Sequence, residues 1–158
     1  MRTRFSLLIG VASVTVLLVS LGPRLAAGSP ARFRQAKLAP PVIHESFTPL
    51  PCTGAPGHRT TLEMEGCPEQ QILATDARID SLNQAIFSRL FDAAARRRFI
   101  AGHNAWLAYR HAYCLGVSDV FEGGTEASAL DTSCVAGVNA EHVKDLKTFL
   151  AAFGPKPS

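Results

Sequence analysis

Large side chains recur at alternating steps of three and four residues near the middle of the chain, and this spacing predicts a helix. The members of this stripe are Phe99, His103, Trp106, Arg110, Tyr113 and Val117. Positions three and four apart share one face of a helix, whereas the period of a strand is two. We therefore expect neighbouring segments to cover the Trp106 indole and to hydrogen-bond the Arg110 guanidinium.

Two more helices are predicted on either side of this stretch. Before it, a stripe from Ile72 to Leu90 indicates a helix over about Pro68–Leu90, with Pro68 as its first residue. A capping box at Thr60–Glu63 predicts a separate helical turn before that helix. Asp92 is expected to cap the middle helix, which we expect to end near Leu115, at Gly116.

The third helix is predicted to start near Ser128, after a loop that begins at Gly116, and to stop at Gly154–Pro155. Its stripe consists of Leu130, Cys134, Val138, Leu146, Phe149, Leu150 and Phe153. No stretch has the pattern of a strand. The fold class is therefore predicted to be all-α, a small antiparallel three-helix bundle. The register of the first hairpin brings Arg110 near Thr75 and Asp76, so we expect Arg110 to pair with Asp76 or with nearby backbone carbonyls.

The N-terminal part has the order of parts found in a secretory signal. Arg2 and Arg4 precede the uncharged run Phe5–Leu21, and small residues follow. Residues 1–28 are therefore predicted to be a signal peptide or a retained signal anchor, which makes the protein exported, to the periplasm or beyond. Residues 29–51 contain five prolines and predict a mobile, disordered tether. The helical domain is expected over residues 52–154, with a short tail at 155–158.

Four cysteines behind an export signal predict two disulfides. We favour Cys52–Cys67 with Cys114–Cys134, which close short loops; the rival scheme is Cys67–Cys114 with Cys52–Cys134. No Cys-x-x-Cys or paired Cys/His spacing is present, so no metal site and no cofactor is predicted. Catalytic motifs such as Gly-x-Ser-x-Gly and His-Glu-x-x-His are also absent, and the chain is not expected to be an enzyme.

The formal net charge of the whole chain is +3, but basic and acidic residues are unevenly distributed along it. Residues 52–158 hold ten Lys and Arg residues against twelve Asp and Glu residues, a balance of −2 that does not favour nucleic acid as a partner. Gly116–Ser133 contains four acids and no Lys or Arg, whereas the opposite end of the predicted bundle carries basic residues. These are Arg89, Arg96, Arg97, Arg98, Lys144 and Lys147.

The stretch AWLAYRHAYC, with the elements around it, resembles the LprI-like lysozyme inhibitor family of small bacterial extracytoplasmic domains. The shared elements are Cys52 and Cys67, Leu82–Asn83, Trp106, Arg110 and Cys114, the loop Glu122–Thr125, and Cys134. The resemblance covers about Cys52 to Phe153. The chain departs from the family pattern at His103, Phe87, His142 and Pro68, which puts in doubt the hydrogen bonds made at those positions.

The resemblance implies an inhibitor of a lysozyme-type glycosidase, with that enzyme as protein partner. We expect an acidic Gly-Gly loop to bind it, with backbone N–H groups facing the carboxyl pair of the enzyme. The candidate partner-binding residues are Asp119, Phe121, Glu122, Gly123, Gly124, Thr125 and Glu126; the candidate structural residues are Asp76, Asn83, Trp106, Arg110 and the four cysteines. Two alternatives stay open: the glycines only form a turn, or the scaffold is a non-inhibitory envelope module. Membrane contact is expected only through an uncleaved N-terminal segment.

Overall fold

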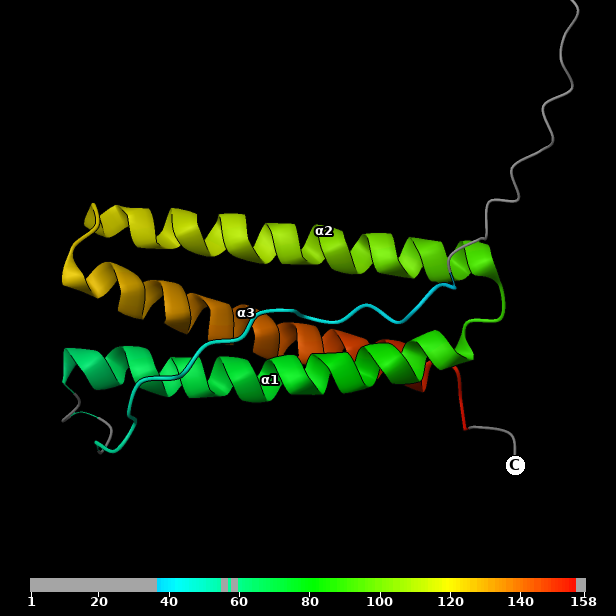
Figure 1. Ribbon diagram of the computed structural model, residues 1–158, viewed down its shortest axis with the longest axis horizontal. Coiled ribbons are helices and arrows are strands. Elements are labelled where there is room, and N and C mark those ends of the chain that lie inside the picture. Colours follow the sequence, from blue (N-terminus) through cyan, green and yellow to red (C-terminus); the bar gives the residue numbers. More distant parts are fainter. Residues whose placement is uncertain (1–36, 55–56, 58–59, 156–158) are drawn as a thin grey trace, which may run out of the picture. The chain divides into compact units, whose positions relative to one another are not determined.

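Three long helices follow one another in antiparallel order (Figure 1). The computed structural model describes residues 37–54, 57 and 60–155. The elements are α1 (Thr61–Arg89), α2 (Ala93–Ser118), the short 3-10 helix η1 (Asp119–Phe121) and α3 (Thr125–Ala151). Helix α3 packs against both other helices, and more extensively against α1. Since these described residues contain no strand, the all-α three-helix prediction is confirmed.

Helix α1 begins with the predicted capping box. The Thr60 hydroxyl accepts the Glu63 N–H at 3.3 Å, and the Glu63 carboxylate accepts the Thr60 N–H at 3.1 Å. The predicted break before Pro68 is wrong, because α1 runs through this proline without interruption. Pro68 removes one intrahelical N–H donor, but its neighbours are held from outside the helix: Cys67 by a disulfide and Ile72 by burial.

The predicted cap of the second helix is right, but its predicted end and the predicted start of the third helix need correction. Asp92 caps α2 as expected, accepting the Ala95 N–H at 2.5 Å. However, α2 continues through Gly116 to Ser118, and α3 begins at Thr125 instead of near Ser128. Glycine disfavours a helix by only about 1 kcal/mol, so burial of Cys114 and Ser118 on either side of it is enough to extend α2.

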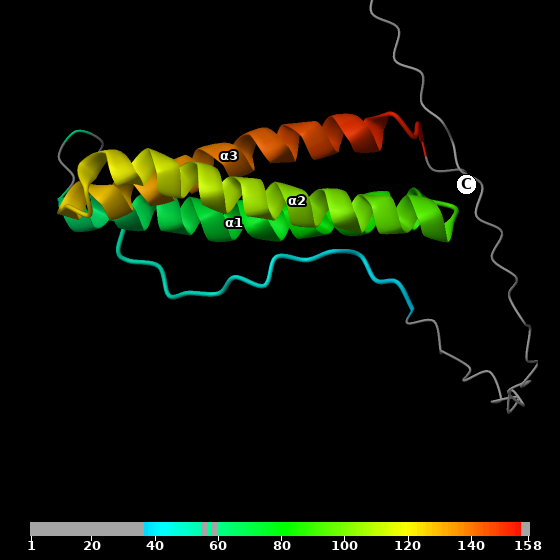
Figure 2. The ribbon, with the colours of Figure 1, turned by 90° about the horizontal axis from the view of Figure 1, so that it is seen from above.

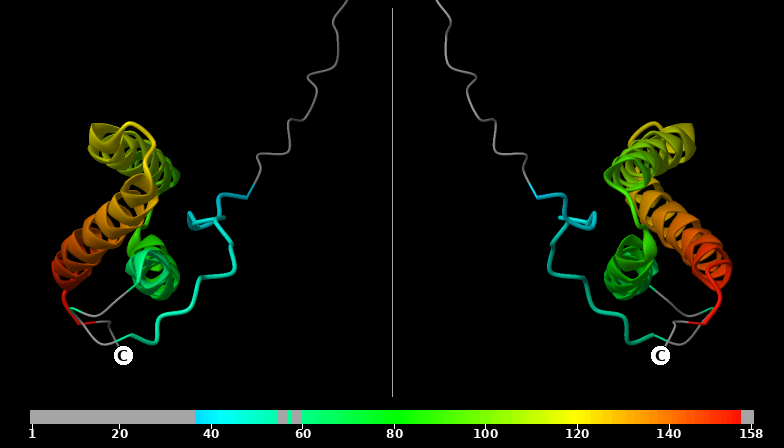
Figure 3. Two further views of the ribbon diagram at one scale, coloured as in Figure 1. Left: turned by 90° about the vertical axis from the view of Figure 1, so that its left-hand side faces the viewer. Right: turned by 90° about the vertical axis from the view of Figure 1, so that its right-hand side faces the viewer.

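Residues 37–51 are extended and lie along the bundle (Figures 1, 2 and 3). Ile43 is buried, and its N–H donates to Asp80 at 2.9 Å. The Pro41 carbonyl accepts from Asn83 at 3.3 Å, and the Leu50 N–H donates to Glu69 at 2.6 Å. For this part of the predicted 29–51 tether, mobility is therefore the wrong expectation; residues 29–36 lie outside the described residues. Extended, proline-rich chain has no hydrophobic periodicity from which this packing could be predicted.

The two disulfides follow the favoured scheme, Cys52–Cys67 and Cys114–Cys134, which excludes the rival pairing. They lie in the half of the bundle formed by residues 60–77 and 111–134, which we call the disulfide end. The opposite half, residues 84–98 and 144–155, contains the α1–α2 connection and is called the hairpin end. The predicted signal segment, residues 1–28, lies outside the described residues, and none of the described helices is long and apolar enough to cross a membrane.

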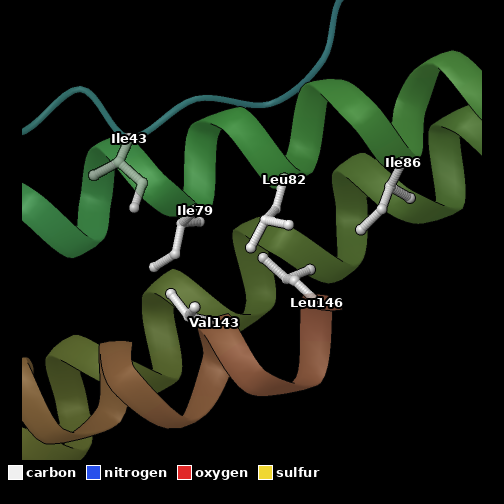
Figure 4. Packing of buried hydrophobic residues seen from close by; sticks show 6 residues of the cluster. All are labelled: Ile43, Ile79, Leu82, Ile86, Val143 and Leu146. Carbon is white, nitrogen blue, oxygen red and sulfur yellow. The ribbon is translucent and has the colours of Figure 1, made fainter. Parts of the chain in front are cut away.

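Apolar packing is concentrated between the middle of the bundle and the hairpin end (Figure 4). The buried cluster consists of Ile43, Ile79, Leu82, Ile86, Val143 and Leu146. Phe99, Trp106, Leu107, Leu150 and Phe153 pack against it from partly buried positions. The stripe predicted for the third helix is thus only partly right, because Val143 and Asn139 are buried there whereas Leu130 and Val138 are only partly so.

Candidate functional site

A buried arginine joins all parts of the bundle. Arg110 on α2 is 2% exposed and donates to Asp76 Oδ1 at 3.1 Å, to Asn139 Oδ1 at 2.9 Å and to Glu45 Oε1 at 2.5 Å. The predicted pair Arg110–Asp76 is confirmed. Asn139 in turn donates to Asp76 Oδ1 at 2.7 Å. Burial raises the pKa of Asp76, although Arg110 opposes that shift. The network spans α1, α2, α3 and the extended segment, so its role is structural.

Trp106 lies between the Arg110 network and two histidines. Its indole stacks on His142, with ring centroids 3.8 Å apart, and the Arg110 guanidinium lies 5.2 Å from the indole centroid. Burial, and then the nearby His103, lowers the pKa of His142 to about 4, so this ring is neutral at pH 7. Tyr113, predicted on the same buried stripe, is exposed, and Cys114 takes the buried position four residues after Arg110.

Asn83 holds the second histidine. Its side-chain amide lies 3.1 Å from His103 Nδ1 and also donates to the Pro41 carbonyl. Burial lowers the pKa of His103 as well. Among the described residues no group of three or more His, Cys, Asp or Glu side chains is placed to hold a metal ion. These buried polar residues join the helices to one another and to the extended segment, and Asn83, His103 and His142 also line a cavity of about 540 Å³.

The acidic tip, residues 119–126, is held in place by the Cys114–Cys134 disulfide, which joins α2 to α3 below it. The chain reverses through Glu122 and Gly123, with φ of 47° and 78°. Gly123 suits this left-handed conformation because it has no Cβ. The Gly124 N–H donates to the Phe121 carbonyl at 2.9 Å, so this predicted donor is used inside the turn.

The structure also changes the expected setting of Thr125 and Glu126. They are the first two residues of α3 instead of loop residues, and Gly124 is the N-cap. The first N–H groups of a helix have no intrahelical acceptor, and Gly124 has no side chain to cap them. The backbone donors of Thr125 and Glu126 therefore replace that of Gly124 as the groups available to a bound acceptor.

The acidic tip exposes apolar side chains among carboxylates. Val120 is 74% exposed and Phe121 is 42% exposed. Phe121 also lines a groove of about 350 Å³ whose other walls include Met64, Pro68 and Glu126. The disulfide end, residues 60–77 and 111–134, contains eight acids and no Lys or Arg, and Asp76 is the one buried acid among them. This end of the molecule thus offers an apolar contact surrounded by negative charge.

The sequence missed two members of the Arg110 network. Glu45 lies in the proline-rich segment, where no pattern marks a partner of the buried arginine. Asn139 did carry a signal, since Ala136, Asn139, Val143 and Leu146 follow one another at steps of three and four and all are buried. The candidate partner-binding residues lie on η1, the turn after it and the first turn of α3, and their role in binding stays a prediction.

One comparison with known proteins identifies the family. The family model described as Lysozyme inhibitor LprI matches residues 52–146, more than half of the chain. No curated protein and no solved structure matches. The matched range contains all four cysteines, the Trp106–Arg110 pair and the acidic tip. The chain therefore belongs to the LprI lysozyme inhibitor family.

Proposed function

We propose that this protein is an exported inhibitor that binds a lysozyme-type glycosidase through its acidic tip. The observation that carries the proposal is the exposed pair Val120 and Phe121, placed among carboxylates at the disulfide end, where residues 60–77 and 111–134 contain no Lys or Arg. A basic lysozyme would be attracted to such a surface, since charge complementarity speeds association and selects partners.

The chemistry of the enzyme explains what the tip has to supply. Lysozyme-type glycosidases use two carboxyl groups on either side of the scissile bond. An inhibitor needs to block that cleft, and hydrogen-bond donors would favour the ionised carboxylate. In our proposal the exposed N–H groups at the start of α3 supply these donors, while Val120 and Phe121 pack against the wall of the cleft. The carboxylates of Glu122 and Glu126 face the basic rim.

Two features support an extracytoplasmic location. Both disulfides require an oxidising compartment to form and persist. The sequence before the described residues also has the order of parts expected of a secretory signal. The proposed inhibitor therefore acts outside the cytoplasm, where lysozymes reach bacterial walls.

A turbidity assay with bacterial walls tests the proposal. Residues 36–158, which form one compact unit, are titrated against a panel of basic and acidic lysozymes. We expect inhibition of a basic lysozyme, and we expect Glu122→Lys with Glu126→Lys to raise the inhibition constant by about tenfold or more, since reversed charge opposes association. Arg97→Glu with Lys147→Glu, a charge change of equal size and opposite sign at the hairpin end, is the control and should not raise the inhibition constant. If no lysozyme in the panel is inhibited, the scaffold serves as a non-inhibitory envelope module instead.

A further inference from the structure

The hairpin end exposes a large aromatic side chain. Phe91 lies in the connection between α1 and α2 and is 92% exposed, while its neighbours Phe87 and Leu90 are buried. The Asp92 carboxylate fixes the backbone beside it by capping α2. The fold therefore turns Phe91 outward at a defined position. An aromatic ring exposed at the end of a bundle is suited to the boundary between lipid headgroups and acyl chains.

Basic residues outnumber acidic ones at the hairpin end, where Phe91 lies. The hairpin end carries six basic residues, Arg89, Arg96, Arg97, Arg98, Lys144 and Lys147, against two acids, Asp92 and Asp145; Lys144 is also paired with Glu141 at 2.6 Å. Arg96 is held beside the connection by a bond to the Leu90 carbonyl at 3.0 Å, and Arg89 by one to the Gly154 carbonyl at 3.3 Å. Arg97 and Arg98 are exposed. The surface around Phe91 is thus positively charged, in contrast to the acidic tip.

The chain also enters the bundle from this side. The described extended segment, cyan in Figures 1 and 2, begins toward the hairpin end, and the connection between α2 and α3 lies at the opposite end. The preceding part of the sequence contains the uncharged run Phe5–Leu21. The described part of the chain thus begins toward the end that carries Phe91 and the arginines.

We propose that the hairpin end docks on an anionic lipid surface. Phe91 enters the boundary below the headgroups, and Arg97, Arg98 and Lys147 contact lipid phosphates. Because α2 has 26 residues, the acidic tip is then held about 39 Å from the surface, at 1.5 Å per residue. That distance is several times the Debye length of about 8 Å at physiological salt. The membrane charge therefore does not repel the tip, which remains free to bind a partner.

Vesicle co-sedimentation tests this docking. Residues 36–158 are used so that the run Phe5–Leu21 cannot itself insert. Vesicles of equal parts phosphatidylglycerol and phosphatidylcholine are compared with vesicles of phosphatidylcholine alone. We expect binding to the mixed vesicles only, weakened by high salt. The Arg97→Glu, Arg98→Glu variant should bind at least about 25-fold more weakly, since each basic residue near an anionic surface contributes about fivefold.

The variant Phe91→Ser separates lipid insertion from simple charge attraction. We expect it to bind about tenfold more weakly than the native domain, because it loses the buried aromatic ring. Tyr109→Ser removes another exposed aromatic residue, away from the hairpin end, and Arg78→Glu reverses an exposed charge in the middle of α1. Both controls should bind within about twofold of the native domain. Equal binding to both kinds of vesicle, unchanged binding of Phe91→Ser, or losses in the controls as large as in the hairpin variants would overturn the proposal.

Discussion

The two ends of this bundle are stabilised by different interactions. Toward the hairpin end, α1 and α3 meet through the branched aliphatic side chains of Ile79, Leu82, Ile86, Val143 and Leu146. At the disulfide end most of the buried residues are smaller, such as Cys67, Ser118 and Ala129, and Ile72 is the one large aliphatic residue buried there. There the helices are joined by the Cys114–Cys134 disulfide and, toward the middle, by the Arg110 network.

This difference explains how the acidic tip can be both exposed and fixed. A large apolar core under the tip would have needed bulky side chains on the segments that carry the partner-binding residues. Covalent and ionic links instead leave Val120 and Phe121 outside. The hairpin end, with its apolar core, can hold Phe91 outward without losing its packing. Stability and recognition are thus separated in space, and variants can affect one without the other.

The largest expected effect is on the Arg110 network. Arg110→Ala leaves Asp76 buried without its cationic partner and should lower the free energy of unfolding by about 3–5 kcal/mol. Ile86→Ala, in the apolar half, should cost about 2–5 kcal/mol through loss of packing. Urea denaturation monitored by circular dichroism measures both. A cost below about 1 kcal/mol for Arg110→Ala would show that the network does not hold the bundle together.

The two disulfides are expected to have similar effects on stability and different effects on inhibition. Removing either pair by double substitution to alanine should cost about 3 kcal/mol, since the pairs are separated by 15 and 20 residues. Only Cys114→Ala with Cys134→Ala releases the acidic tip, so only this variant should lose inhibition at a temperature where both remain folded. Equal loss of inhibition in the two variants would mean that the Cys114–Cys134 bond has no special role at the tip.

The stacked histidine predicts a dependence of stability on pH. His142 has its pKa lowered from 6.5 to about 4. The unfolded chain therefore binds a proton between these pH values when the folded chain does not, and stability, complete above pH 6.5, falls as the pH drops toward 4. Because His142 is only half-buried, we expect a loss of about 2 kcal/mol, less than the full shift implies.

Unfolding experiments at pH 7 and pH 4.5 measure this loss. His142→Gln should remove most of it, while His111→Gln, at an exposed position on α2, should leave it unchanged. Glu63 affects stability in a lower pH range. Hydrogen bonds from Thr53 and Thr60 lower its pKa from 4.5 to about 2, so its contribution to stability is lost as the pH falls below 4.5. A pH dependence that survives in His142→Gln would assign it to another group.

The smallest effects are expected at two glycines of opposite character. Gly123→Ala places a Cβ at a φ of 78° and should cost about 1 kcal/mol. Gly116→Ala lies within α2, where its Cβ meets no other atom within 4 Å, and should stabilise the protein by up to about 1 kcal/mol. Thermal unfolding measures the change in stability of both variants. A change of the same sign in both would contradict the backbone conformations assigned to the two glycines.

The sequence predicted the helices better than it predicted what joins them. The number and order of the helices, the caps at Thr60 and Asp92, and the Arg110–Asp76 pair all followed from local chemistry and from the register of a hairpin. The boundaries at Pro68 and Gly116 did not, because burial outweighed the weak local preferences of those residues. Glu45 was missed because residues 37–51 are extended and have no periodicity. The partner-binding role of the acidic tip remains a prediction.

Hydrogen exchange in the presence of a basic lysozyme tests the central claim most directly. Amide exchange is measured for residues 36–158 alone and with an equimolar amount of an enzyme that they inhibit. Our account predicts that exchange slows at residues 119–126, including the N–H groups at the start of α3, and stays unchanged at residues 89–98. Inhibition together with protection at the hairpin end and none at the acidic tip would contradict it.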